Sequence, residues 1–317
     1  MKKIPILIDC DTGTDDAVAL IMACAAQNLQ LLGVTTVAGN QTVDKTTLNT
    51  LKILSFLGRK DVPVARGAER PLLRTLQVAA EVHGSSGLGG VILPDPDMQA
   101  QQMNAVELIR SVLIKNDVPV TLVCTAPLTN IALLLSAYPQ LKHKIERIVM
   151  MGGGLSHGNV TAAAEFNIYA DPEAAGIVMN SGVSVVMCPL DMTEQALLKF
   201  DEIEHFASEK GKVSRLALDI FRFYAQYYEA RGFSGVALHD PTTIAYLMRP
   251  ELFTLRPMYV QVETAPGAAT YGMTFADTRI MADPPAPNAQ VCIDVQRDAF
   301  IRLLTECCRA YDTGTPV

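Results

Sequence analysis

A short apolar run that ends in acidic residues opens the chain. Residues 4–8 form a continuous apolar run and lead into Asp9-Cys10-Asp11-Thr12-Gly13-Thr14-Asp15-Asp16. This order is typical of a buried parallel strand that feeds a loop at its carboxyl end. The apolar positions that follow have the helical spacing i, i+3, i+4 and i+7 and form one face: Ala17, Leu20, Ile21 and Cys24. The pattern predicts a strand, a loop and a helix in succession.

The alternation of apolar runs and amphipathic segments continues along most of the chain. The apolar runs predict strands at 31–37, 62–65, 120–124, 148–151 and 184–187. The amphipathic segments between them predict helices at 43–57, 105–114, 128–136 and 172–180. This order indicates an α/β fold, with an open, doubly wound, mostly parallel sheet (a Rossmann-like core) flanked by helices.

The carboxyl-terminal part of the chain has a different pattern. A helical region is expected at about 201–231, beside the sheet, and another helix follows Pro241. Segments 259–263, 271–276 and 290–295 have period-2 character, which predicts an antiparallel margin of the sheet before a last helix. Because no linker separates these parts, we expect a single domain over residues 1–317.

Two long loops interrupt the alternation, at 67–100 and 152–170. Loops of this length in a compact domain are commonly functional, and ligands of open α/β sheets bind at the carboxyl ends of strands. The first loop carries His83 among glycines, where burial is not expected and a substrate contact is favoured over packing. The second carries Asn159, Glu165 and Asn167, which are either ordinary loop residues or partners for a ligand rich in hydroxyl groups.

Charge and cysteine content narrow the possible partners. The net charge is -7 and no Lys/Arg-rich run occurs, which argues against binding to nucleic acid and favours a small neutral substrate. No apolar stretch is long enough to span a bilayer, and the run at 4–8 is too short for a signal-peptide core. Seven cysteines without a CxxC pair indicate reduced thiols, so we expect a cytoplasmic protein.

The acidic turn indicates a metal site. Four aspartates within eight residues repel one another unless a cation or protonation relieves the charge, and hard oxygen ligands favour calcium or magnesium. The alternative is a well-capped helix with solvated carboxylates. Asp240, between His239 and Pro241, is expected to cap a helix, and it could also be a further metal ligand. His239 is either a core histidine or a general acid.

These residues resemble the motifs of the inosine-uridine-preferring nucleoside hydrolases. The opening matches the DxDxGxDDA pattern of that family. The resemblance extends nearly end to end, through Val37-Ala38-Gly39-Asn40, His83-Gly84-Ser85-Ser86-Gly87, Pro127-Leu128-Thr129-Asn130-Ile131-Ala132, Met150-Met151-Gly152-Gly153-Gly154, Ala164-Glu165-Phe166-Asn167-Ile168, Asp171-Pro172-Glu173-Ala174-Ala175 and His239-Asp240-Pro241. Two positions depart from the family pattern, Thr12 where proline is common and Ala126 where glycine is common; neither removes an expected ligand.

The resemblance implies a calcium-dependent enzyme that hydrolyses the N-glycosidic bond of ribonucleosides. Asp11 would contact calcium and take a proton from the water that attacks C1′. Asp16, Asp240 and the Thr125 carbonyl would complete the protein's share of the metal site, and Asp9 would brace it. Attack opposite the base would invert the anomeric centre, with positive charge developing on the ribose as in glycoside hydrolysis.

The resemblance also assigns the substrate contacts. Asp15, Asn40 and Asn167 would hold the 2′- and 3′-hydroxyls, and Asn159 with Glu165 the 5′-hydroxyl. His83 and His239 would face the base, with His239 protonating it as it leaves, and Met151 and Tyr227 would also bind the substrate. A homodimer or homotetramer and a role in nucleoside salvage are expected, while the preference for purines or pyrimidines stays open. The alternatives are a phosphatase of the haloacid dehalogenase type and a non-catalytic calcium-dependent ribose-binding protein.

Overall fold

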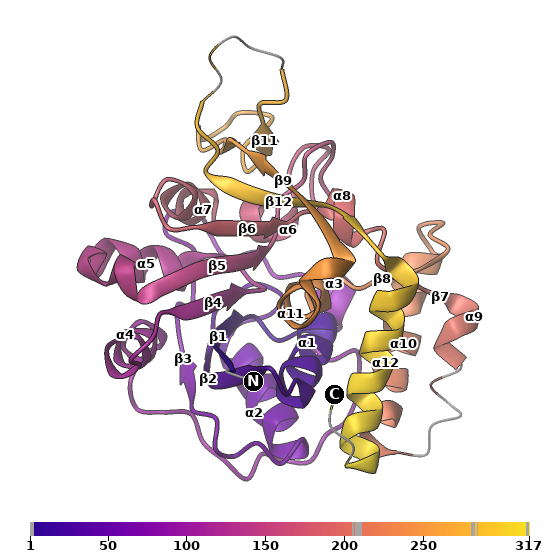
Figure 1. The fold of residues 1–317 in the computed structure, drawn as a ribbon. Helices are drawn as coiled ribbons and strands as arrows, with labels where there is room; N and C mark the ends of the chain where they lie inside the picture. The colour runs from indigo at the N-terminus through magenta and orange to yellow at the C-terminus, as the bar shows by residue number, and fades with distance from the viewer. Residues whose placement is uncertain (1–2, 205, 207–210, 280–282, 284, 315–316) are drawn as a thin grey trace.

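An eight-stranded sheet forms the centre of the molecule (Figure 1). The computed structural model describes residues 3–204, 206, 211–279, 283, 285–314 and 317. The strands lie in the order β3-β2-β1-β4-β5-β6-β12-β9, and all neighbours are parallel except β12 and β9. This confirms the predicted fold class. Their bounds are β1 (Ile4–Cys10), β2 (Leu29–Thr36), β3 (Val64–Arg66), β4 (Val120–Cys124), β5 (Ile145–Met151), β6 (Val185–Cys188), β9 (Phe253–Met258) and β12 (Ala289–Val295).

The strand order reverses between β1 and β4, which creates a crevice at their carboxyl ends. From β1 the chain builds outward through β2 and β3, and then returns to the other side of β1 with β4. Asp9 pairs with Thr35 of β2 and with Cys124 of β4, and its carbonyl accepts a hydrogen bond from the Thr125 amide at 3.0 Å. Ligands of open α/β sheets bind at such a reversal, so residues that directly follow β1 and β4 are in position to form a site.

Helices cover both faces of the sheet (Figure 1). Successive residues of a strand point to opposite faces, and in β1 Ile6 and Ile8 pack into one apolar cluster while Leu7 packs into the other. The first cluster includes α1 (Thr14–Ala25), α2 (Val43–Phe56), α10 (Lys212–Glu229), α11 (Pro241–Met248) and α12 (Arg297–Thr313). The second includes α4 (Ala105–Lys115), α5 (Thr129–Ala137) and α7 (Pro172–Met179).

Short elements complete the chain around this core. Two strand pairs stand apart from the main sheet and are antiparallel: β7 (Leu197–Lys199) with β8 (Gly235–Ala237), and β10 (Val260–Val262) with β11 (Thr274–Ala276). The short helices are α3 (Ala80–His83), α6 (Phe166–Ala170), α8 (Leu190–Thr193), α9 (Phe200–Ile203) and the 3₁₀ segments η1 (Pro139–Lys144) and η3 (Pro250–Leu252). Both α3 and α6 lie within the segments predicted to be long loops.

The antiparallel margin differs from the prediction in its composition. Segments 259–263 and 271–276 were expected at the sheet margin, but they form the separate β10–β11 pair. The marginal strand is β9, which the pattern did not reveal because only its end residues, Phe253 and Met258, are buried. The predicted helical region at 201–231 contains α9 and α10, while residues 205 and 207–210 lie outside the described residues.

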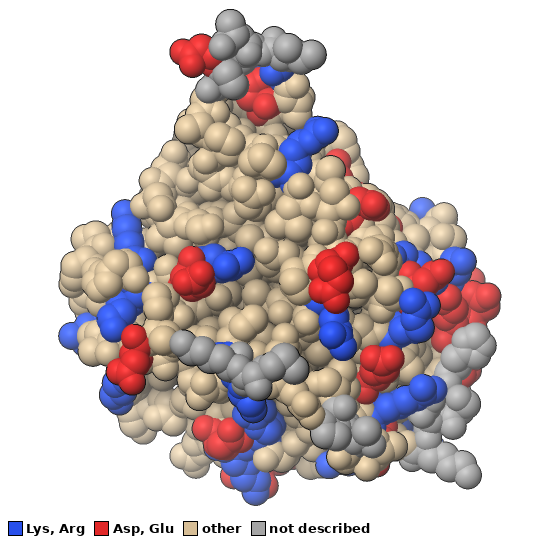
Figure 2. Space-filling model, viewed as in Figure 1, with Lys and Arg blue, Asp and Glu red and all other residues tan. Residues whose placement is uncertain are grey.

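Charged side chains are mixed on the surface. On the face seen in Figure 2, Lys and Arg are interspersed with Asp and Glu around broad uncharged areas. Among the helices of the described residues, none is both long enough and apolar enough to cross a membrane.

Candidate active site

A pocket of about 280 Å³ opens at the reversal of strand order. Its walls come from segments that are far apart in the sequence: the start of α1, the loop around α3, the loop before α6, α10 and the turn before α11. All eight residues predicted to bind substrate line it, and they are Asp15, Asn40, His83, Met151, Asn159, Glu165, Asn167 and Tyr227. Thr125, His239 and Asp240 line it too.

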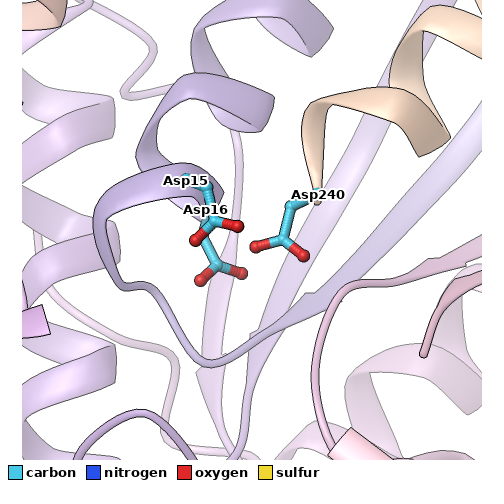
Figure 3. A group of neighbouring side chains, drawn as sticks. All are labelled: Asp15, Asp16 and Asp240. Atoms are coloured by element: carbon cyan, nitrogen blue, oxygen red, sulfur yellow. The ribbon is translucent and has the colours of Figure 1, made fainter. Parts of the chain in front are cut away.

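Three buried aspartates meet beside this pocket, and two of them, Asp15 and Asp240, line it (Figure 3). Asp15 and Asp16 lie in the first turn of α1, and Asp240 precedes Pro241 at the start of α11. Each offers a carboxylate oxygen, and these oxygens all lie within 4.8 Å of one another. Among the described residues, this is the group whose geometry suits a metal ion. The group includes the expected ligands Asp16 and Asp240, contains Asp15 as well, and does not contain Asp11.

Asp240 does not act as a helix cap, contrary to one expectation from the sequence. It occupies the N-cap position of α11, but its side chain makes no capping hydrogen bond. The carboxylate turns instead toward Asp15 and Asp16, as Figure 3 shows. Burial and the negative charges of Asp15, Asp16 and Asp11 raise its pKa well above the usual range. A structural cap has no need for this costly environment, which a cation would relieve.

Asp11 lies beside the cluster and is held by Asn40. Its Oδ2 accepts a hydrogen bond from the Asn40 amide at 2.6 Å, and its Oδ1 accepts one from Asn40 Nδ2 at 3.1 Å. Burial, followed by the negative charge of Asp16, raises the pKa of Asp11 well above its usual range. The neighbouring Gly39 makes this arrangement possible, because a Cβ there would lie 2.1 Å from Asp11 Oδ2.

Asp16 joins the acidic turn to β4. Its Oδ2 accepts hydrogen bonds from the Gly13 amide at 2.8 Å and from Asn40 Nδ2 at 3.1 Å. Its Oδ1 accepts one from the Thr125 hydroxyl at 2.8 Å. Glycine at position 13 leaves room for the His83 ring, since a Cβ there would lie 2.6 Å from His83 Nδ1. Asp16 is therefore fixed by contacts from three separate segments.

Asp9 supports the site through contacts with neighbouring elements. Its Oδ1 accepts hydrogen bonds from the Thr35 hydroxyl at 2.5 Å and from Asn130 Nδ2 at 2.8 Å, while its buried Oδ2 has no hydrogen-bond partner among the described residues. Burial raises the pKa of Asp9 to about 7. It does not line the pocket, and its contacts tie β1 to β2 and α5.

Asn167 reaches the pocket floor from α6. Its Nδ2 donates to the Thr125 carbonyl at 3.2 Å and to the Met151 carbonyl at 3.1 Å, which holds the side chain across the ends of β4 and β5. The Thr125 carbonyl, an expected metal ligand, thus contacts an expected ribose-binding residue. The Thr125 hydroxyl also donates a hydrogen bond to Asp16.

Glu165 is buried at the N-cap of α6. Its carboxylate accepts hydrogen bonds from the amides of Asn167, Ile168 and Gly153 at 2.9, 3.2 and 2.8 Å. Burial nevertheless raises its pKa to about 7. Asn159, by contrast, is exposed, and its Oδ1 accepts a hydrogen bond from the Phe166 amide at 2.9 Å. Both residues line the pocket.

His83 is buried, although the sequence predicted an exposed position for it. It lies in α3, and its Nδ1 contacts the amide and the hydroxyl of Thr14 at 3.3 and 2.9 Å. Since an amide N–H can only donate, Nδ1 is an acceptor, and the neutral ring carries its proton on Nε2. Burial lowers the pKa of His83 to about 3, so the ring is neutral at pH 7.

His239 is held by two hydroxyl groups that the sequence did not reveal. Its Nδ1 lies 2.8 Å from Thr193 Oγ1, and its Nε2 lies 2.7 Å from the Tyr228 hydroxyl. Burial lowers its pKa to about 4. Tyr228 directly follows Tyr227 in α10, an expected substrate contact, whereas nothing in the sequence pattern marks Thr193, which lies in α8.

Three tyrosines of α10 form the wall nearest the histidines. The rings of Tyr224 and Tyr228 lie 5.1 Å apart, edge to face, and Tyr224 lies 5.8 Å from His83. Tyr227 lies 5.5 Å from Tyr228 and is covered by the Arg231 guanidinium, 3.5 Å above its ring. This wall is aromatic and the opposite floor is acidic, so the pocket suits a ligand with one flat apolar part and one part rich in hydroxyl groups.

Comparison with known proteins assigns the chain to a family. The family described as inosine-uridine preferring nucleoside hydrolase matches residues 6–302. The chain belongs to this family. It is therefore a hydrolase of the N-glycosidic bond of ribonucleosides. This membership favours nucleoside hydrolysis over both the phosphatase and the non-catalytic ribose-binding protein that the sequence left as alternatives.

Relatives within the nucleoside hydrolase family are similar over their full length. A pyrimidine-specific ribonucleoside hydrolase RihA of Citrobacter koseri is 48% identical over 305 residues, covering 96% of this chain and 97% of the relative. RihA of Escherichia coli O81 is 47% identical, covering 97% of this chain and 99% of its own. The solved structure of a purine-preferring ribonucleoside hydrolase from Gardnerella vaginalis is 33% identical, covers 98% of this chain and all of its own, and has a TM-score of 0.91.

Proposed function

We propose that this nucleoside hydrolase depends on calcium held at the acidic floor of the pocket. The convergence of Asp15, Asp16 and Asp240 supports this proposal most directly. The available donors are oxygens of carboxylates and of the Thr125 carbonyl, a set that suits calcium or magnesium and does not suit zinc. The burial and raised pKa values of the three carboxylates indicate a site in need of positive charge. We favour calcium because it tolerates the irregular geometry of such a site.

Asp11 is the general base in this proposal. It would accept a proton from the water that attacks C1′, and the positive charge of a nearby calcium ion would keep its carboxylate ionised for this role. The two hydrogen bonds from Asn40 orient its carboxylate. When bound, calcium would neutralise the neighbouring carboxylates and acidify the attacking water.

The polar floor would hold the ribose. Asp15, Asn40 and Asn167 are proposed to bind the 2′- and 3′-hydroxyls, because all three are buried at the floor. Asn159 and Glu165 are proposed to bind the 5′-hydroxyl. The negative floor would stabilise the positive charge that develops on the ribose as the C1′–N bond breaks. Attack from the face opposite the base would invert C1′.

The aromatic wall would hold the base and supply a proton to it. His83, Met151 and Tyr227 are proposed to contact the base, and His239 to protonate it on departure. Because His239 is neutral at pH 7, it would donate from an uncharged ring and recover a proton from the Tyr228 hydroxyl, 2.7 Å away. The negative charge of the departing base then passes to the Tyr228 oxygen, until water returns a proton to it.

Pyrimidine nucleosides are the proposed preferred substrates. The two RihA relatives described as pyrimidine-specific are 48% and 47% identical to this chain, whereas the purine-preferring structure is 33% identical. A role in nucleoside salvage follows from this activity. An assay of base release from cytidine, uridine, inosine, adenosine and their 2′-deoxy forms tests the proposal. We expect cytidine and uridine to be cleaved fastest and the deoxy forms to fail, since they lack a hydroxyl at the floor.

Three further features complete the proposal. A single domain over residues 1–317 is supported by β12, which joins the main sheet next to β6, and by α12, which packs against α1.

A cytoplasmic location is supported by the cysteines: all seven lie in the described part of the chain, and none is in a disulfide. A homodimer or homotetramer rests on the family resemblance, and light scattering during size-exclusion chromatography would test it.

A further inference from the structure

Arg74 contacts two tyrosines just outside the pocket. Its Nη1 donates a hydrogen bond to the Tyr169 carbonyl at 2.5 Å. The centre of its guanidinium lies 3.8 Å from the ring centroid of Tyr169 and 5.0 Å from that of Tyr271. A cation over an aromatic face is attracted by the electron density of the ring, and arginine adds planar stacking. Arg74 therefore joins three segments that are distant in the sequence.

The first segment is the chain that leads into α3 and forms the outer wall of the pocket. At its start, the Leu72 amide donates to Asp171 Oδ2 at 2.9 Å, and at its end the Ala79 amide donates to the Asn40 carbonyl at 3.1 Å. Between these two backbone anchors, Gln77 and Val78 line the pocket yet are exposed. Arg74 supplies a side-chain anchor in this span.

The second segment is α6, which carries Asn167. A helix of five residues has few internal hydrogen bonds, and the carbonyls of its last turn have no partner within the helix. Arg74 provides one of these carbonyls, that of Tyr169, with a charged donor at the negative end of the helix. The contact therefore steadies the element that presents Asn167 to the pocket.

The third segment is the turn that joins β10 to β11. Tyr271 donates a short hydrogen bond from its hydroxyl to Glu173 Oε1. The next residue, Gly272, has a φ of +84°, and a Cβ there would lie 2.9 Å from Tyr169 Cα. The turn therefore packs closely against α6, and the Tyr271 ring contacts the Arg74 guanidinium. Where Arg74 meets α6, a cavity of only about 10 Å³ remains, so the junction is closely packed.

We propose that Arg74 is a positioning residue that fixes the outer wall of the nucleoside pocket. It acts on substrate binding and not on bond cleavage, because Asp11 and His239 lie on other elements and have their own hydrogen bonds. The wall it holds is formed by residues 77–82 and by α6. This inference rests on the proposed use of the pocket for nucleosides.

Steady-state kinetics on uridine and cytidine test the proposal, with the wild type, Arg74→Ala, Arg74→Lys and the control Arg110→Ala. Arg110 makes similar contacts on α4, with the Tyr138 ring at 5.0 Å and Glu107 at 3.0 Å, but it does not line the pocket. We expect Arg74→Ala to raise KM about tenfold and to change kcat less than about threefold. Arg74→Lys keeps the charge, so its KM should lie between those of the wild type and Arg74→Ala. Arg110→Ala should leave KM unchanged.

Amide hydrogen exchange provides a readout that does not depend on turnover. In Arg74→Ala, the amides of Leu72 and Ala79 should exchange faster than in the wild type and in Arg110→Ala. An unchanged KM in Arg74→Ala, or a loss confined to kcat, would overturn the role of Arg74. If the wild type itself released no base from any nucleoside, the proposed function would fail instead, and the exchange result would still report on the anchor.

Discussion

The Tyr228 hydroxyl lies 2.7 Å from Nε2 of His239, and both side chains are buried in the wall of the pocket. Burial keeps His239 uncharged at pH 7, with a pKa of about 4. An uncharged imidazole is a weak acid, so a histidine that protonates a leaving base gains from a second donor that restores its proton. Tyr228 is placed to be that donor, and its own position is supported by Tyr224, whose ring is 5.1 Å away.

Removal of the Tyr228 hydroxyl should affect the departure of the base selectively. We expect Tyr228→Phe to lower kcat on uridine by about 10- to 100-fold, since assistance by a general acid contributes about 10²- to 10⁴-fold and His239 remains. His239→Ala should have a larger effect. Hydrolysis of p-nitrophenyl riboside should change little in either variant, because its leaving group departs without a proton.

A tyrosine outside the pocket controls for the loss of a tyrosine hydroxyl hydrogen bond. Tyr138 donates a hydrogen bond of 2.6 Å to Glu107, far from the pocket, and Tyr138→Phe should keep wild-type rates on both substrates. Equal losses on uridine and on p-nitrophenyl riboside in Tyr228→Phe would contradict a role in leaving-group protonation.

Substitution of Asp11 should separate activity from stability. Asp11→Asn retains the shape of the side chain and removes the proton acceptor, so we expect kcat to fall by about 10³-fold or more. Burial and the charge of Asp16 already disfavour the ionised form of Asp11, so the melting temperature without metal should be equal or higher. Calorimetry and a base-release assay measure the two effects. Asp61→Asn, which removes an exposed partner of Arg59, should change neither. Near-normal turnover in Asp11→Asn would exclude Asp11 as the base.

The acidic cluster was the part of the site that the sequence predicted best. A strand that ends in aspartates and is followed by a helix fixes where Asp15 and Asp16 lie relative to the sheet. This placement depends only on residues that are close together in the sequence. The approach of Asp240 is not local, because it depends on β8 and α11 returning to the start of α1. The residue alone favoured a helix cap with a metal ligand as the second possibility, and the family resemblance made it an expected metal ligand.

Long-range side-chain contacts account for what the sequence did not predict. The burial of His83 results from its contact with Thr14, 69 positions away, and glycines around it gave no sign of this. Thr193 contacts His239 across 46 positions. The edge strand β9 lacked a periodic pattern because its central residues are exposed or only partly buried. Local periodicity describes elements, whereas these features depend on how the elements meet.

Removal of the metal should abolish activity reversibly. If a cation holds Asp15, Asp16 and Asp240 together, a chelator should reduce base release to background, and added calcium should restore it. Magnesium serves as the comparison ion, and its smaller radius and strict octahedral preference should make it a poorer replacement. Full activity after exhaustive chelation, verified by elemental analysis, would contradict the metal site.

The stability of the metal-free protein should fall as pH rises. The pKa values of Asp9, Asp15 and Glu165 are raised to about 7, above the value of about 4 expected for an unfolded chain. Between these two values the folded protein binds more protons than the unfolded chain, so each unit of pH lowers the free energy of unfolding. The melting temperature in chelator should therefore decrease from about pH 5 to about pH 7 and then level off.

Calcium should oppose this trend, because it binds the ionised carboxylates and competes with protons. The increase in melting temperature caused by calcium should accordingly grow with pH over the same range. Asp15→Asn removes one charge from the cluster, and it should raise the melting temperature of the metal-free protein at high pH while reducing the increase caused by calcium. A metal-free protein that becomes more stable as the pH rises would mean that these carboxylates are ionised and satisfied without a cation.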